Sequence, residues 1–175
     1  MTPEILGQLA IFGGIAFGVL FGLPVMPFFI AAGAMWGIEG LPIVLLALLI
    51  HFFASYYIAR GILRPLAEKF FKKFESKMKL PDAATIGPIK LILLVRMIPG
   101  IPLVAVSYGL AALWDIPVMV YVFVSLFTQL FWATASMLVG ASLMKNSAVM
   151  LVCACAVFAI LIVISRNYAR RTQAR

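Results

Sequence analysis

The sequence predicts an all-α polytopic membrane protein with about four full transmembrane helices and an inverted repeat of two opposed re-entrant helical hairpins. The first observation is composition: of 175 residues, 65% are hydrophobic and 11% are charged, with a mean hydropathy of +1.13. A soluble domain of this length could not bury so much apolar surface. The second observation is that several apolar runs are long enough to cross a bilayer. The third is that two other runs are broken by proline and glycine.

The first third of the chain contains two predicted transmembrane helices and one hairpin. Residues 5–22 are apolar and long enough to cross once. Residues 23–42 are broken by Pro24, Pro27 and several glycines. Such residues are tolerated at membrane depth only where protein or a wet cavity satisfies the freed backbone groups. We therefore expect a re-entrant hairpin over 23–42, and a second transmembrane helix over 43–60.

Residues 62–80 follow a different pattern. At 100° per residue, their apolar side chains share one face and their charged side chains share the other. Pro65 suits the first turn of such a helix, and Pro81 ends it. A basic amphipathic helix of this kind lies in the membrane interface. The alternative is a helix packed in a small soluble domain, but the chain offers nothing soluble for it to pack on.

The second broken run, residues 89–117, contains Arg96-Met97-Ile98-Pro99-Gly100-Ile101-Pro102. An arginine, two prolines and a glycine within an apolar run predict the second re-entrant hairpin, lining a polar path. Residues 118–143 and 148–165 are the last two predicted transmembrane helices. Residues 166–175 form a basic tail.

Fourteen Lys and Arg residues against six Asp and Glu give a net charge of +8. The basic residues flank apolar segments, so we expect anionic lipid headgroups as their partners and no nucleic acid. Lys and Arg concentrate in residues 60–79 and in the tail, which the positive-inside rule places in the cytoplasm. With four crossings, both termini are expected to be cytoplasmic. The first hairpin then enters from outside and the second from the cytoplasm.

Three prolines of the first hairpin recur 75 positions later in the second, as the pairs Pro24 and Pro99, Pro27 and Pro102, and Pro42 and Pro117. Each copy is a hairpin followed by one transmembrane helix, so a single crossing per copy inverts the second copy relative to the first. Inverted repeats with broken segments facing each other near the midplane are typical of transporters. The alternative is a coincidence among the ten prolines of the chain.

Three short motifs lie in these segments. Residues 96–102 form the pattern R-x-x-P-G-x-P, and Ser107-Tyr108-Gly109 follow as a Y-x-x-G-like segment. Residues 23–37 contain A-A-G-x-x-x-G after a proline-rich opening. Residues 57–61 read Y-I-A-R-G. Together they resemble the VTT-domain group within the DedA superfamily, also called SNARE-associated Golgi proteins, whose Y-x-G-R-x segment has glycine in place of Ala59. The resemblance covers about residues 20 to 143.

The resemblance implies two opposed re-entrant hairpins and movement of lipid between leaflets. Bacterial relatives are associated with recycling of undecaprenyl phosphate and with the proton motive force, and eukaryotic relatives with phospholipid scrambling. We expect a location in the bacterial inner membrane. The chain departs from the usual DedA form in two places. That form has an acidic residue just after the first prolines, where this chain has Phe28 and Phe29, and a second arginine shortly after the Pro-Gly, where this chain has Pro102. The missing acid weakens the case for proton coupling there.

Arg96 is the leading candidate for binding substrate. An arginine within a membrane segment is costly and normally pairs or lines a wet cavity, and its planar fork suits a phosphate. The alternative is that Arg96 snorkels to the cytoplasmic interface. Tyr57 and Tyr108 either hydrogen-bond a headgroup or anchor at an interface. The other predicted substrate-binding residues belong to the motifs above and are Pro24, Pro27, Arg60, Pro99, Gly100 and Pro102.

Glu39, His51 and Asp115 are the candidates for proton coupling. Glu39 and Asp115 lie at the exits of the two hairpins in near-equivalent repeat positions, where a carboxylate either carries protons, gates lipid entry or caps the membrane edge. His51 lies near the middle of its span, and an unperturbed pKa near neutral suits a proton relay. The alternative is a neutral histidine hydrogen-bonded to a neighbouring helix.

The leading hypothesis is a flippase or scramblase that moves a phosphate-bearing lipid such as undecaprenyl phosphate or a phospholipid. The alternatives are a proton-coupled transporter of a small solute or ion, and a membrane-surface scaffold that recruits partners. We expect no enzyme, no cofactor and no metal site, because the chain has one histidine and lacks H-E-x-x-H, G-x-S-x-G and P-loop motifs. A homodimer is left open.

Overall fold

The computed structural model describes residues 2–65, 87–96 and 102–145, and seven separate positions between 149 and 163. Every regular element in these parts of the chain is a helix or a helical turn, as the predicted all-α class requires. Predictions for most of the interfacial helix 62–80, for Pro99 and Gly100, and for the tail lie outside the described residues. The last predicted crossing is described only at the seven separate positions, which are helical.

Along the chain, α-helices alternate with short 3₁₀ turns (η1, η2) and one π-helical turn (η3). In chain order the described elements are α1 (Pro3–Ala16), η1 (Gly18–Phe21), α2 (Val25–Trp36), η2 (Gly37–Gly40), α3 (Leu41–Ile58), η3 (Ala59–Leu63), α6 (Pro88–Arg96), α7 (Leu103–Leu113) and α8 (Val118–Lys145).

The first two helices, α1 and α2, form a helical hairpin. Gly14 of α1 faces the ring of Phe28, and Gly7 faces the end of the Met35 side chain. From the first contact to the second, the residue number falls in α1, from 14 to 7, and rises in α2, from 28 to 35. The two helices are therefore antiparallel. The chain reverses in η1 and at Gly22, whose φ of 92° lies in the left-handed region that favours glycine.

Helices α6 and α7 form a second hairpin. Arg96, the last residue of α6, donates a hydrogen bond to Ser107 in the second turn of α7. The second arm begins directly after Pro102, just as α2 begins directly after Pro24. Proline suits these positions because it has no N–H to leave unpaired at a helix start and its fixed φ is compatible with one.

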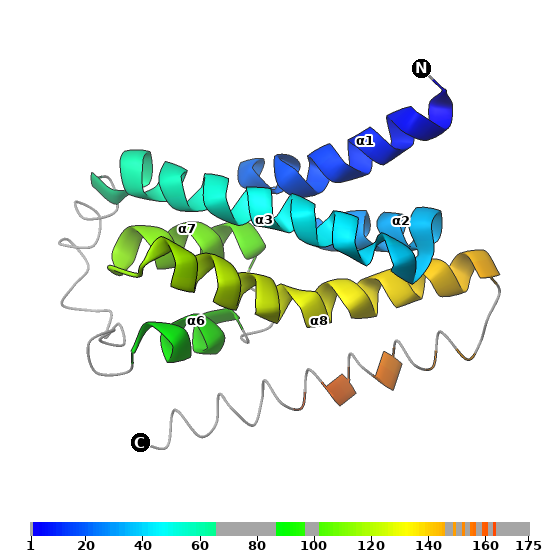
Figure 1. The fold of residues 1–175 in the computed structure, drawn as a ribbon. Coiled ribbons are helices and arrows are strands. Elements are labelled where there is room, and N and C mark those ends of the chain that lie inside the picture. The colour runs from blue at the N-terminus through cyan, green and yellow to red at the C-terminus, as the bar shows by residue number, and fades with distance from the viewer. Residues whose placement is uncertain are drawn as a thin grey trace.

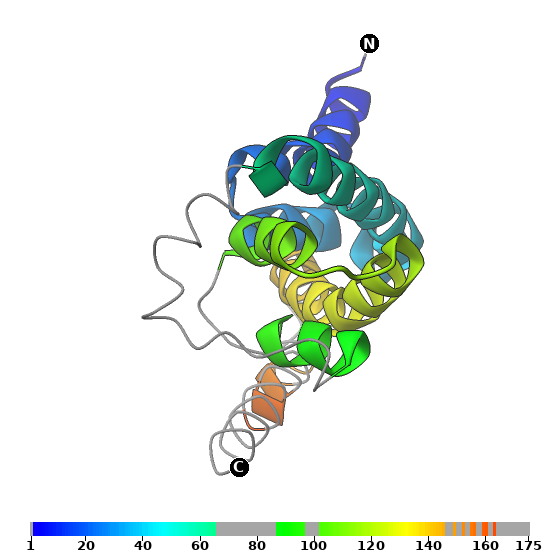
Figure 2. The same cartoon turned by 90° about the vertical axis from the view of Figure 1, so that its left-hand side faces the viewer.

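The two halves of the chain run in opposite directions. In Figure 1, α1 and α3 run from right to left and α2 from left to right, whereas α6 and α8 run from left to right and α7 from right to left. The two hairpins therefore open toward opposite ends of the bundle. Seen from the end, α7 lies in the middle, between α3 and α6 (Figure 2). The Tyr108 hydroxyl of α7 donates to the Leu20 carbonyl in η1 at 2.9 Å, so the second hairpin touches the tip of the first.

Helices α2 and α8 approach each other very closely. A Cβ atom at Gly33 would overlap the backbone of Met137, and a Cβ atom at Gly140 would overlap the carbonyl of Ile30. The two glycines therefore permit a distance between backbones that a larger residue would prevent. Gly109 lies 76 positions after Gly33, one position away from the proline offset of 75, and has no described atom within 4 Å of where its Cβ would stand. The two halves thus pack differently at this point.

Two stretches, Val25–Leu63 and Val118–Lys145, are long and apolar enough to cross a membrane. The 28 residues of α8 extend about 42 Å, against about 30 Å for the hydrocarbon core of a bilayer. Helices α1 and α7 are also apolar but have 14 and 11 residues, which gives lengths of about 21 and 17 Å. Neither is long enough to cross alone.

The first two predicted segments have different boundaries in the structure. Residues 5–22 do not form one continuous α-helix, because α1 ends at Ala16 and the chain then turns through η1. Residues 23–42 contain one α-helix followed by a turn at Gly37, which has a φ of 64°. The antiparallel hairpin is therefore α1–α2. The predicted spans 43–60 and 118–143 correspond to α3 and α8, with small shifts at the ends.

Candidate functional site

Arg96 ends α6 and points into the helix bundle, with 8% of its surface exposed. Its Nη2 donates to Ser107 Oγ at 3.3 Å and approaches the Tyr121 hydroxyl at 3.5 Å. The guanidinium carbon lies 4.7 Å from the centre of the Phe52 ring and 5.6 Å from that of Tyr121. Side chains of α3, α7 and α8 therefore surround the guanidinium, which does not snorkel to the surface.

The charge of Arg96 has no carboxylate partner among the described residues. The described ion pairs join Asp115 to Arg60 and to Arg64. Arg96 Nε and Nη1 are buried and make no hydrogen bond. An unpaired buried charge is costly, so Arg96 is a buried cation with two donor nitrogens that an anion would satisfy.

Tyr121 of α8 connects the helices around Arg96. Its hydroxyl donates to the Ser107 carbonyl at 3.2 Å and lies 3.1 Å from Ser55 Oγ of α3. Because the Tyr121 proton is used toward α7, its oxygen is left to accept from Arg96, while Ser55 Oγ donates its own proton to the Phe52 carbonyl at 3.1 Å. The ring of Tyr121 also meets Phe52 edge-on, with 6.2 Å between ring centres. Tyr121 thus fixes the position of the guanidinium through both its ring and its hydroxyl.

Two more polar side chains are buried near this cluster. His51 of α3 is 0% exposed, and neither of its ring nitrogens has a hydrogen-bond partner. Its ring meets Phe52 edge-on at 5.3 Å. Ser125 of α8 is also 0% exposed, and its hydroxyl has no partner. The predicted alternative for His51, a hydrogen bond to a neighbouring helix, is not made within the part of the chain that the structure describes.

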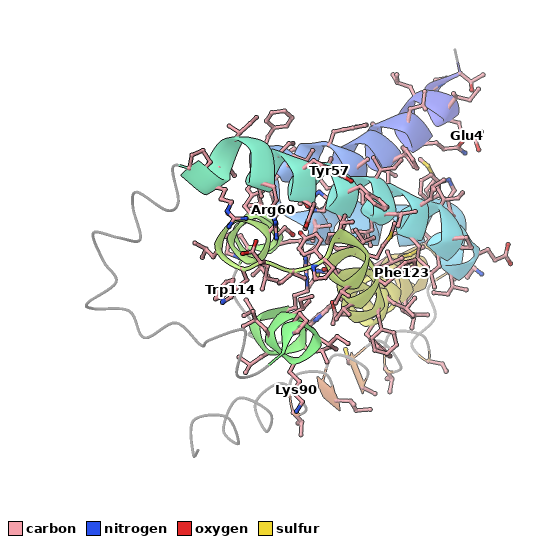
Figure 3. All side chains as sticks on the ribbon, turned by 60° about the vertical axis from the view of Figure 1, so that its left-hand side comes forward. Glu4, Tyr57, Arg60, Lys90, Trp114 and Phe123 are labelled. Carbon is pink, nitrogen blue, oxygen red and sulfur yellow. The ribbon has the colours of Figure 1, made fainter. Side chains whose placement is uncertain are left out.

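Arg60 and Asp115 belong to a separate cluster at one end of the bundle. Arg60 lies in η3 and points toward the α7–α8 loop that contains Trp114 (Figure 3). Its Nη1 lies 3.1 Å from Asp115 Oδ1, and its Nη2 donates to the Trp114 carbonyl at 3.2 Å. Arg64 donates to the same carboxylate at 2.8 Å, and the Tyr56 hydroxyl donates to the Ile116 carbonyl at 2.8 Å. These contacts fasten the end of α3 to the loop.

The Asp115 side chain is 73% exposed. The hydrogen bond and charge of Arg64, followed by the charge of Arg60, hold the pKa of this carboxyl below its usual range. An ionised carboxylate held by two arginines is therefore the state that the geometry favours.

Among the described residues, the remaining predicted site residues make no hydrogen bond or ion pair with Arg96. Tyr57 is 62% exposed on the outer side of α3 (Figure 3), and Tyr108 is bonded to the tip of the first hairpin. Glu39 is exposed in the turn between α2 and α3. The prolines at the starts of the hairpin arms are exposed, namely Pro24, Pro27 and Pro102. Of the predicted residues, Arg96 and His51 both contact the ring of Phe52, and Arg60 pairs separately with Asp115.

Sequence reasoning did not single out Ser55, Ser107, Tyr121 or Ser125 as site residues. A usable signal was present, because His51 and Ser55 are four residues apart, as are Tyr121 and Ser125. Polar residues at this spacing lie on one face of a helix, and in an apolar helix such a face must meet polar partners or a ligand. Ser107 has no comparable signal.

The cluster offers hydrogen-bond donors and aromatic rings, and His51 is the single potential metal ligand near it among the described residues. Among the described residues, no three His, Cys, Asp or Glu side chains are placed to hold a metal ion. Comparisons with family models, with curated proteins and with solved structures found no match. The resemblance to the DedA superfamily therefore rests on the sequence motifs alone and stays a prediction.

Proposed function

We propose that this chain is a membrane lipid transporter, a flippase or scramblase, in which Arg96 engages the phosphate of a lipid headgroup. The observation that carries the proposal is a buried arginine with two unbonded donor nitrogens and no carboxylate beside it among the described residues. Arginine occurs inside membrane proteins where it pairs or faces a polar path. Its guanidinium binds phosphate through two parallel hydrogen bonds.

The short helices support an interpretation as re-entrant hairpins. Helices α1, α2, α6 and α7 have 14, 12, 9 and 11 residues, each shorter than the roughly 20 residues needed to cross a bilayer. They form two hairpins that open to opposite ends of the bundle (Figure 1). We infer that one hairpin enters from each side, between the crossing helices α3 and α8. Broken segments meeting near the midplane are where transporters bind their substrates.

The sequence motifs agree with this proposal. Their resemblance to the DedA superfamily favours a phosphate-bearing lipid, such as undecaprenyl phosphate or a phospholipid, and a location in the bacterial inner membrane. The excess of Lys and Arg, 14 against six acidic residues, favours contact with anionic headgroups at the membrane surface.

Reconstitution in lipid vesicles tests the proposal. The purified full chain should accelerate exchange of headgroup-labelled anionic lipids between leaflets. Arg96→Gln should reduce the rate roughly tenfold or more, because a charge-assisted hydrogen bond to phosphate is lost. Arg96→Lys should retain part of the rate, since a point charge remains without the planar fork. No acceleration with any of several anionic lipids would remove the support for this function.

Lys90 supplies the matched control for Arg96. It lies on the same helix, α6, but is exposed and points away from the bundle (Figure 3). Lys90→Gln removes one positive charge without touching the buried cluster, so exchange should stay close to that of the unchanged chain. An equal loss in both variants would assign the effect to net charge.

A proton-coupled transporter of a small solute or ion is the second candidate, and the buried, unbonded imidazole of His51 favours it. The vesicle assay distinguishes the two when it is repeated with a pH gradient and with labelled solute in place of labelled lipid. Under this second function, solute uptake follows the gradient and His51→Gln abolishes that dependence, while lipid exchange is absent.

A further inference from the structure

Three buried polar side chains in one region of the interior make fewer hydrogen bonds than they can. Arg96 and His51 each have two side-chain nitrogens without a hydrogen-bond partner, and the Ser125 hydroxyl has no hydrogen-bond partner. Buried polar groups are paired in the large majority of native structures, so each exception calls for an explanation such as a bound molecule. The three residues come from three different helices, α6, α3 and α8.

The packing of α3 against α8 places His51 and Ser125 at the same level. Ser55 Oγ of α3 lies 3.1 Å from the Tyr121 hydroxyl of α8, and the two helices are antiparallel (Figure 1). His51 lies one helical turn before Ser55, and Ser125 lies one turn after Tyr121. His51 and Ser125 therefore lie on the faces of α3 and α8 that pack against each other, both displaced in the same direction from that hydrogen bond by one helical turn of about 5.4 Å.

Arg96 lies beside this level of the bundle. Its guanidinium covers the ring of Phe52, which adjoins His51 in the chain and contacts it edge-on. It also reaches the hydroxyl of Tyr121, one turn from Ser125. The three residues thus form one cluster that is linked by Phe52 and Tyr121.

The chemistry of the cluster selects its ligand. A guanidinium only donates, and a neutral imidazole and a hydroxyl each have one proton to donate. The cluster has a positive charge, and no described carboxylate balances it. A cationic ligand would be repelled, whereas an oxyanion would accept several of these hydrogen bonds and neutralise Arg96.

We propose that His51 and Ser125 complete the anion site of Arg96, so that a phosphate group is held jointly by α3, α6 and α8. The phosphate is that of a lipid headgroup or free inorganic phosphate, and both offer the same oxygens to the site. The source of the phosphate rests on the proposed function, but the site itself does not. It joins the first half of the chain, through α3, to the second half, through α6 and α8.

The single histidine of the chain gives a direct test. The full chain is labelled with ¹⁵N-histidine and purified in detergent, and inorganic phosphate is added while the His51 ring nitrogens are followed by NMR. A saturable shift is expected. A second titration uses a short-chain phosphatidic acid in the same micelles. Saturation with both supports a site for the phosphate group itself, saturation with the lipid alone supports a headgroup site, and no shift with either overturns the proposal.

Variants separate the contributions of the three residues. Ser125→Ala and Arg96→Gln should each weaken phosphate binding by roughly tenfold or more, since each removes a donor to an anion. Ser142→Ala is the control, because Ser142 is also buried on α8 but its hydroxyl already donates to the Val139 carbonyl at 2.7 Å. The phosphate affinity, measured by calorimetry, should fall less in His51→Gln than in His51→Phe, because Gln retains a hydrogen-bond donor.

Two results would overturn the proposal. One is unchanged phosphate affinity in Ser125→Ala and His51→Phe, checked for folding by thermal unfolding. The other is a His51 NMR signal that shifts in Ser125→Ala but does not shift when phosphate is added. That result would mean that the two side chains interact with each other and do not bind phosphate. If lipid exchange needs Arg96 but not His51 or Ser125, the proposed function stands without this site. If all three bind phosphate and no lipid moves, the site stands without the function.

Discussion

Tyr121 holds Arg96 through two kinds of contact, and its hydroxyl can be removed without removing its ring. In Tyr121→Phe, the Ser107 carbonyl loses its donor and the guanidinium loses an acceptor, while the aromatic face over the charge remains. We expect the free energy of unfolding to fall by about 1–3 kcal/mol, because buried polar groups are left unpaired. SDS titration in mixed micelles measures the change.

Tyr57 provides the control for this substitution. It is on the same bundle but 62% exposed, so Tyr57→Phe should leave the unfolding free energy nearly unchanged. Equal changes in the two variants would show that the hydroxyl of Tyr121 does not support the cluster.

At the residue scale, Arg96 and His51 could be predicted because ionisable side chains are rare in apolar helices and need a reason to be there. Their surroundings could not. The contacts of Arg96 with Phe52 and Tyr121 join residues that are 44 and 25 positions away in the chain. They depend on how α6 is placed against α3 and α8, which composition and periodicity do not determine.

At the scale of elements, the close approach of α2 and α8 makes a strong prediction at Gly140. In Gly140→Ala, the new methyl group would overlap the Ile30 carbonyl and come within 2.8 Å of the Ala34 nitrogen. Because both obstacles are backbone, the helices must separate along their length. We expect the free energy of unfolding to fall by at least about 1–3 kcal/mol. The same SDS titration measures this change.

Gly109→Ala is the matched control, because the described residues leave open space at that Cβ. Alanine is favoured over glycine inside a helix, so stability should stay constant or rise by up to about 1 kcal/mol. A loss as large as that of Gly140→Ala would contradict the close packing of α2 on α8.

The contact between η3 and the α7–α8 loop makes a prediction about pH. Because the arginines lower the folded-state pKa of Asp115, its stabilising effect is complete above the usual value of 3.8 and disappears as pH falls through the lowered pKa. The melting temperatures of the unchanged chain and Asp115→Asn should therefore differ by a constant amount from about pH 5 to 8 and converge in stronger acid.

The difference between these two melting temperatures should be small and should shrink in high salt, because the Asp115 carboxylate is 73% exposed. Thermal unfolding at several pH values and two salt concentrations measures it. A difference that grows as pH falls would contradict the direction of the shift.

The helices that lack internal breaks were the easiest elements to predict. The spans expected at 43–60 and 118–143 lie within a few residues of α3 and α8, because uninterrupted apolar runs leave few other structures possible. The pairing of the short helices was not predictable. Turns at Gly22 and at Gly37 are both glycine turns with positive φ, and only the contacts between α1 and α2 decide which one closes the hairpin.

At the scale of the whole molecule, the polar cluster around Arg96 contains residues of both halves, which run in opposite directions. Helix α3 of the first half contributes His51 and Phe52, and the second half contributes Arg96 and Tyr121. The proline offset of 75 positions predicted halves of opposite direction. It did not predict a cluster shared by the two halves, because the second half has no histidine 75 positions after His51 and the first half has no arginine 75 positions before Arg96.

The helix directions also predict which ends of the chain share a side of the membrane. In Figure 1, the start of α1, the turn between α2 and α3 and the end of α8 lie at one end of the bundle, and η3 and the start of α6 lie at the other. The segment 66–86 joins η3 to α6 and contains five lysines, Lys69, Lys72, Lys73, Lys77 and Lys79, so the positive-inside rule places that end in the cytoplasm. The start of α1 should then lie outside, although the count of four crossings had placed it in the cytoplasm.

Single cysteines tested with a membrane-impermeant maleimide decide between these arrangements, after Cys153 and Cys155 are replaced by serine. In vesicles of one orientation, Thr2→Cys, Glu39→Cys and Lys145→Cys should react together, and Gly61→Cys and Lys90→Cys should react only when the opposite face is accessible. The reason is geometric: α1 is about 21 Å long and paired antiparallel to α2, so it cannot carry its first residue to the far side. Reaction of Thr2→Cys together with Lys90→Cys would mean that α1 crosses the membrane and that the opposed hairpins are not both re-entrant.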